Sequence, residues 1–144
     1  MKRWQIALEA LGLRALLPVL VRVLPLDRTL RVLTPRATSS ATSGDALALI
    51  ERITDTLTRR VPGLRTACLQ RALMRYALLR RHGHAGSFVI GVRPGGPDGF
   101  EAHAWVTLGG EAIMEHGAPD YRGTFVWPQD AGRNLDESLR SVHT

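Results

Sequence analysis

The stretch T-A-C-L-Q-R-A-L-M-R-Y, Thr66 to Tyr76, decides how the rest of the chain is interpreted. It contains the only cysteine, Cys68, and its apolar residues recur at helical spacing. Thr66 is a suitable N-cap, so we expect a helix to start there with Cys68 in its first turn. Unpaired N–H groups and the positive end of the helix dipole favour a thiolate at that position. Cys68 is therefore a candidate nucleophile.

Length and composition describe an ordinary globular protein. The chain has 144 residues, of which 44% are hydrophobic and 22% charged, enough for one domain with a hydrophobic core. One cysteine excludes an internal disulfide and a multi-cysteine metal site, and it fits a reducing cytoplasm. Charged residues and Pro18 interrupt the apolar N-terminal run, so we expect no membrane span.

The formal charge of +6 comes almost entirely from arginine. Such a balance is compatible with nucleic acid, an anionic membrane surface or an acidic peptide partner, and also with the arginine usage of GC-rich genomes. No nucleic-acid-binding motif is present, and an aromatic content of 6% leaves few rings for base stacking. We therefore expect no nucleic-acid partner.

Four segments are distinguished by their patterns. They are a helical lobe (1–33), a Ser/Thr/Pro/Gly-rich linker (34–44), a core bearing the chemistry (45–130) and a polar tail (131–144). In the lobe one helix is expected from Arg3 to about Leu17, ended or capped by Pro18, and a second over 26–33. Its helical stripe comprises Trp4, Leu8, Leu11 and Ala15.

The sequence pattern of segment 45–130 predicts two helices followed by strands. A helix is expected over about 45–60, and the cysteine helix should end at Gly83, a natural residue for a left-handed C-cap. Strands are expected over 87–93, 100–108 and 111–116, with weaker strand signals at Tyr121 and 125–127. The fold class is thus α+β: N-terminal helices, and a cysteine-bearing helix packed on a small antiparallel sheet.

His103 is the candidate base. It lies in the second predicted strand, in A-H-A-W-V, and a cysteine opening a helix with a histidine on a following strand forms a possible nucleophile–base pair. Trp105 lies two residues on and so on the same face, where it either shields the imidazole or belongs to the core. No H-x-x-x-H or H-E-x-x-H pattern occurs, so neither a metal nor another cofactor is expected.

A third residue should accept the other imidazole N–H, and Glu115, Asp120 and, less well placed, Glu101 are the candidates. The turn at Gly109-Gly110 discriminates between them. A two-residue loop pairs 108 with 111 and turns Glu115 to the opposite face from His103. A three-residue loop with a bulge pairs 107 with 111 and sets Glu115 opposite His103. We predict the bulged hairpin and Glu115, with Asp120 in reserve.

These motifs carry a resemblance. The run C-L-x-R-A-L-x-x-R-Y-x-L-x-R-x-G, then V-I-G-V-R and A-H-A-W-V, over about 62–116, resembles the transglutaminase-like superfamily of papain-type cysteine enzymes. More narrowly it resembles the lasso-peptide leader peptidases, which work as the stand-alone protease half of the maturation B protein. The resemblance implies a cysteine protease that removes the leader from a ribosomally made precursor, with Cys68 as nucleophile and His103 as base. The position that matches the family's third residue is Glu115.

The resemblance also implies partners: a precursor peptide, a separate leader-binding protein and the ATP-dependent cyclase that closes the ring. The backbone N–H of Cys68 is the expected oxyanion donor. Two rivals stay open. One is a transamidase or acyltransferase on the same scaffold, since both reactions pass through a thioester. The other is a non-catalytic basic binding module.

Overall fold

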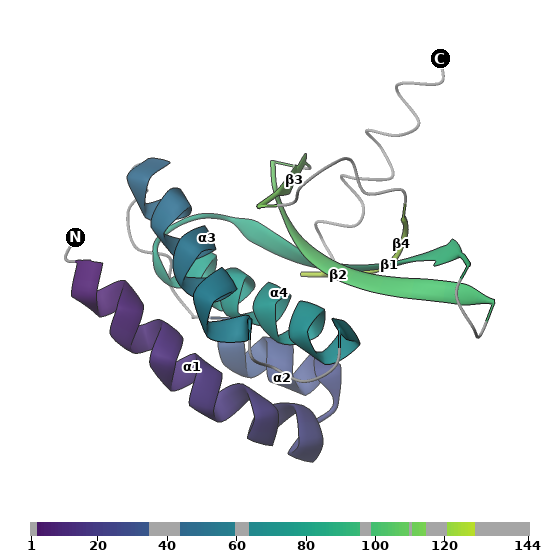
Figure 1. Ribbon diagram of the computed structural model, residues 1–144, viewed down its shortest axis with the longest axis horizontal. Coiled ribbons are helices and arrows are strands. Elements are labelled where there is room, and N and C mark those ends of the chain that lie inside the picture. The colour runs from purple at the N-terminus through teal and green to yellow at the C-terminus, as the bar shows by residue number, and fades with distance from the viewer. Residues whose placement is uncertain are drawn as a thin grey trace. The chain divides into compact units, whose positions relative to one another are not determined.

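The computed structural model describes residues 3–34, 44–59, 64–95, 99–109, 111–114 and 121–128. Two compact units divide the chain, residues 1–85 and 86–144. Within the described ranges, the first unit is helical and the second is an antiparallel sheet (Figure 1). The α+β fold class is therefore confirmed.

The helices of the first unit are α1 Arg3–Val23, α2 Leu26–Leu33, α3 Gly44–Thr58 and α4 Leu64–Arg81. In this unit α1 packs against α3 and α4, and the short α2 contacts α1 and α4. The second predicted helix is thus confirmed as α2. Within the described residues, no helix combines the length and apolarity needed to cross a bilayer.

Pro18 lies inside α1, so the prediction that it ends or caps the first helix is wrong. A proline removes the N–H that would bond to the carbonyl of Arg14, a loss that is costly in an isolated helix. Here the turn before the proline is anchored, because Leu13 and Leu17 are buried in the core, and α1 continues past Pro18 to Val23.

The stripe identified from the sequence is the exposed side of α1. Its four members all lie in solvent, whereas the face that packs is Ile6, Ala10, Leu13 and Leu17. Apolar residues form a row along each of two faces of α1. The helical spacing of the sequence therefore predicts two candidate faces and does not distinguish the buried one from the exposed one. Contact with α3 and α4 decides between them.

The end of α4 follows the prediction. Gly83 has φ +85, its N–H donates to the Arg80 carbonyl, and the N–H of His84 donates to the Leu79 carbonyl. Glycine reaches this left-handed conformation without a Cβ clash, which lets the last carbonyls of the helix find donors. The side chain of His82 is buried and its Nε2 lies 3.1 Å from Oε2 of Glu9, joining the end of α4 to α1.

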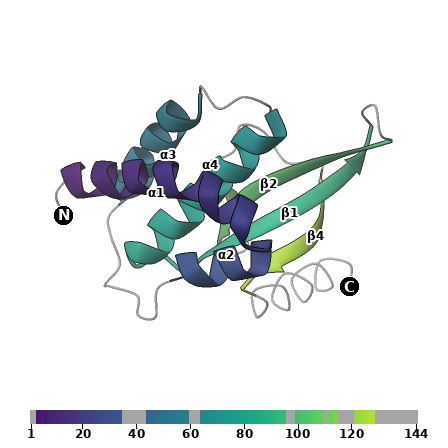
Figure 2. The ribbon, with the colours of Figure 1, turned by 90° about the horizontal axis from the view of Figure 1, so that it is seen from below.

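The strands of the second unit are β1 Gly86–Pro94, β2 Phe100–Leu108, β3 Glu111–Ile113 and β4 Arg122–Trp127. They form one four-stranded antiparallel sheet in the order β3-β2-β1-β4, of which Figure 2 shows β2, β1 and β4 side by side. The first two predicted strands are confirmed to within a residue or so at their ends. β4 confirms the weaker signal at 125–127 and extends it toward Tyr121.

The β2–β3 hairpin is confirmed but its predicted bulge is wrong. Leu108 pairs with Glu111 and Thr107 with Ala112, the register of a two-residue loop at Gly109-Gly110. Gly109 has φ +62, as the tight two-residue turns require. The sequence was compatible with both hairpin registers because glycine accepts either type of turn. The observed pairing of β3 with β2 corresponds to the two-residue loop.

Candidate active site

Cys68 lies near the start of α4. The helix begins at Leu64, two residues before Thr66, so Thr66 lies within the helix rather than at its cap and Cys68 is the fifth residue. The side chain of Cys68 is half-buried. Only the first four N–H groups of a helix lack an acceptor within it, so Cys68 falls one position after them.

A guanidinium lies beside the sulfur. Nη2 of Arg71, one turn further along α4, donates toward Sγ of Cys68 across 3.8 Å. A cation this close favours the thiolate over the neutral thiol, and the thiolate is the nucleophilic form. Arg71 was not singled out from the sequence, although its spacing of three residues from Cys68 is the spacing that brings helical side chains together.

Arg71 is itself held by an ion-pair network that joins α3 to α4. Oδ1 of Asp55 lies 3.7 Å from Nη1 of Arg71 and 2.7 Å from Nη2 of Arg75. The side chain of Arg75 is only 4% exposed, and its Nε donates to Oγ1 of Thr54 across 2.9 Å. A buried cation needs such partners, because an uncompensated one would pay its full desolvation cost. The network thus fixes Asp55 in place to orient Arg71.

The second half of the candidate site lies in the sheet unit. His103 is half-buried in β2, directly opposite Gly91 of β1. Its imidazole stacks on the indole of Trp105, with ring centroids 5.9 Å apart and planes at 19°, and meets the ring of Tyr121 at 5.1 Å. Two aromatic rings therefore restrict how the imidazole can turn. Trp105, left open between a shield and a core residue, is both buried and in contact with the histidine.

Gly91 makes the Trp105–His103 stack possible. A Cβ on this residue would lie 2.5 Å from Cη2 and 2.7 Å from Cζ3 of Trp105, and 2.9 Å from the backbone carbonyl oxygen of Arg122. Distances below 3.0 Å are not tolerated, so the indole covers Gly91 only because no side chain stands there. The sequence V-I-G-V-R shows the glycine but not the ring that needs it.

Gly91→Ala is expected to displace Trp105 and lower the free energy of unfolding by about 1–3 kcal/mol, the usual cost of overpacking a core. Urea unfolding followed by tryptophan fluorescence measures this change. Gly123→Ala is the matched control, since its Cβ would meet only Cγ1 of Val89 at an ordinary 3.6 Å. We expect the control to change stability by less than about 0.5 kcal/mol. Equal effects in the two variants would contradict the steric argument.

Glu101, the least favoured candidate for the third member, is already engaged. Its Oε2 accepts from Nε of Arg93 at 2.8 Å and lies 2.6 Å from Nη2 of the same guanidinium. That guanidinium also lies over the ring of Tyr121, 4.6 Å from its centroid. Arg93 and Glu101 thus support the ring that touches His103, which is a structural rather than a proton-accepting role for Glu101.

Glu115 and Asp120 lie outside the described residues. The two-residue hairpin removes the register argument that set Glu115 opposite His103. The side of the sheet on which Glu115 lies cannot be extrapolated from β3 either. Met114 has φ +59, so the alternation of side chains between the two faces of the strand ends there. The third member therefore stays a prediction that depends on the resemblance alone.

Cys68 and His103 belong to different compact units, so each half of the candidate site stands on the contacts within its own unit. The helical unit brings Cys68 together with Arg71 and Asp55. The sheet unit brings His103 together with Trp105 and Tyr121. Among the described residues, no group of three or more His, Cys, Asp or Glu side chains is arranged to hold a metal ion.

A sequence profile of the transglutaminase-like superfamily matches residues 8–126, most of the chain. The chain belongs to that superfamily. The matched range of this transglutaminase-like domain includes α4 with Cys68 and the strand with His103. The superfamily includes cysteine peptidases and transglutaminases, and its members usually act through a cysteine. Searches of curated proteins and of solved structures gave no significant match.

Proposed function

We propose that this transglutaminase-like protein is a cysteine peptidase that removes the leader from a ribosomally made lasso-peptide precursor. The observation that carries the catalytic role is the guanidinium of Arg71 beside the sulfur of Cys68, which favours the reactive thiolate. The narrower assignment to leader removal rests on the motifs around Cys68 and His103, which resemble those of lasso-peptide leader peptidases.

In the proposed reaction the thiolate of Cys68 attacks the carbonyl carbon of the last leader residue. The peptide C–N bond then breaks, and the imidazolium of His103 gives its proton to the departing amine, leaving the leader as a thioester on sulfur. Next His103 takes a proton from a water molecule, whose oxygen attacks the thioester carbonyl. The leader leaves as a carboxylic acid and Cys68 returns to the thiolate.

Three parts of this mechanism extend beyond the cysteine and the histidine. Glu115 would accept the second imidazole N–H, with Asp120 in reserve. The N–H of Cys68 would donate to the oxyanion; because Cys68 is the fifth residue of α4, this N–H would have to share itself between the oxyanion and its acceptor within the helix. The partners would be the precursor, a separate leader-binding protein and the ATP-dependent cyclase, in the cytoplasm.

The experiment that tests the reaction type incubates the protein with a lasso precursor and its leader-binding protein, with and without a simple primary amine such as methylamine. For a peptidase, mass spectrometry should show the leader as a free acid in the absence of the amine, and the free acid should remain the main product when methylamine is added. Water is then the acceptor of the acyl group.

A leader product that carries the amine, with no free acid released when the amine is left out, would make the protein a transamidase. Cleavage at many unrelated sites of the precursor would contradict a dedicated leader peptidase. An intact precursor under all conditions, with Cys68 still reactive toward alkylating reagents, would leave the thiol chemistry standing but reject the proposed substrate.

A further inference from the structure

The outer face of α1 is apolar and uncovered. We define it as Trp4, Leu8, Leu11 and Ala15, of which the first two are each 56% exposed and Leu11 is 52% exposed. Leu16 and Val19 of the same helix are also exposed, at 46% and 57%. Isolated exposed apolar residues are normal, but a continuous row along one helix marks a contact surface.

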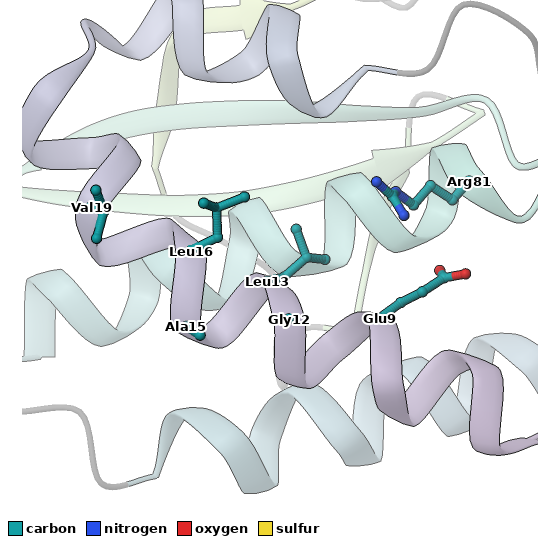
Figure 3. Close-up of a pocket in the computed structure, with 7 residues that line it drawn as sticks. All are labelled: Glu9, Gly12, Leu13, Ala15, Leu16, Val19 and Arg81. Carbon is teal, nitrogen blue, oxygen red and sulfur yellow. The ribbon is translucent and has the colours of Figure 1, made fainter.

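Hollows flank this face on both sides. On the α3 side a hollow of about 370 Å³ lies between the two helices. It is lined by Arg3 and Leu11 of α1 and by Arg52, Ile53 and Leu57 of α3, among others. On the α4 side a hollow of about 540 Å³ lies next to Leu16 and Val19, with Arg81 of α4 on its far wall (Figure 3). Both hollows are wide enough to receive apolar side chains.

The spacing of the outer face indicates a helical partner. Its members are separated by four, three and four residues, the alternation found along the seam between two packed helices. A second helix laid along such a row presents its own side chains to the gaps on either side. The two hollows lie where those side chains would enter.

The net charge of the helical unit indicates which kind of partner helix would complement the outer face of α1. Residues 1–85 contain fifteen Lys and Arg against five Asp and Glu, a net charge of +10, whereas residues 86–144 contain four against eight, a net charge of −4. The cations Arg3, Arg22 and Arg52 are all exposed, and Arg3 and Arg52 line the same hollow. A second copy of α1 would bring like charges together, so an acidic helix is the complementary occupant.

We propose that the outer face of α1 binds an acidic amphipathic helix of a partner protein. The partner's apolar side chains lie along Leu8 and Leu11 and enter the two hollows, and its carboxylates meet Arg3 and Arg52. This surface lies in the helical unit and does not depend on the cysteine chemistry, so it stands or falls independently of the peptidase proposal.

The test uses two fluorescent synthetic helices of equal length with leucine at the same heptad positions, one with glutamate at the remaining positions and the other with lysine. Fluorescence anisotropy with the full chain should show the glutamate peptide binding at least about tenfold more tightly. Leu11→Glu, Leu8→Ser and the pair Arg3→Glu with Arg52→Glu should each weaken that binding about tenfold or more. Circular dichroism verifies that every variant is folded.

The matched controls are Val32→Glu and Arg28→Glu on α2, which alter an exposed apolar residue and an exposed cation outside both hollows. They should leave the affinity for the glutamate peptide within about twofold. Equal binding of both peptides, or equal loss in the controls, would overturn the proposal. So would Leu11-dependent binding to phosphatidylglycerol vesicles without peptide binding, which would make the occupant a lipid surface. A Leu11-dependent dimer in sedimentation would instead make it a second copy.

Discussion

Cys68→Ala is expected to abolish leader cleavage, with a loss of at least about 10³-fold in kcat/KM, because no other group in the reaction can form the thioester. His103→Ala should lower kcat by about 10²- to 10⁴-fold, the usual contribution of a general acid–base. The measurement is the rate of leader release from a precursor in the presence of its leader-binding protein, with product masses determined.

Since Cys68 is the only cysteine, alkylation with iodoacetamide reports on this one sulfur and gives an independent readout. In His103→Ala the thiol should still be alkylated while cleavage is lost, which separates the base from the nucleophile. Both side chains are half-buried, so folding should survive, and circular dichroism verifies it. Cleavage at the wild-type rate in either variant would reject the proposed pair.

The same assay decides the third member. We expect Glu115→Ala to reduce cleavage more than Asp120→Ala, because Glu115 matches the family position. The larger loss in Asp120→Ala would move the role to the reserve residue. Equal small losses would mean that the imidazole is held chiefly by the rings of Trp105 and Tyr121.

Arg71→Ala should slow both alkylation and cleavage. An opposite charge within about 4–6 Å stabilises the ionised form of a group, and the guanidinium of Arg71 lies within that range of the half-buried sulfur of Cys68. The apparent pKa of the thiol, measured from the pH dependence of alkylation, should therefore rise in this variant. Less thiolate at neutral pH should lower kcat/KM about tenfold.

Arg71→Lys is the conservative variant, and it should recover part of both effects because it keeps the charge but not the fixed guanidinium geometry. Arg28→Ala, which removes an exposed cation of α2, controls for the change in net charge and should leave the thiol unaffected. A pKa of alkylation that is unchanged in Arg71→Ala would contradict an electrostatic role. Asp55→Asn is a poor probe, because it would leave Arg75 buried without its carboxylate and destabilise the fold.

Much of the secondary structure was predictable because its signals are local. The glycine-ended α4, the strand at 100–108 and the reversal at Gly109-Gly110 each depend on residues within a few positions of one another. Local sequence patterns gave the wrong prediction where the same residues are compatible with two local conformations. The glycine pair allowed a bulged or a tight hairpin, and only pairing of β3 with β2 chose the latter.

Sequence patterns alone indicate which chemistry is available: a cysteine near a helix start, a histidine in a following strand, and motifs typical of a cysteine enzyme. The surroundings of those side chains depend on how the elements pack. Asp55 contacts Arg71 because α3 packs on α4. The indole of Trp105 can stack on His103 because the neighbouring strand β1 has a glycine, Gly91, beneath the ring. The tertiary structure also decided which apolar stripe of α1 meets the core and which meets solvent. The physical reason is the same each time: periodicity acts along a single element, whereas contacts between elements depend on how those elements pack.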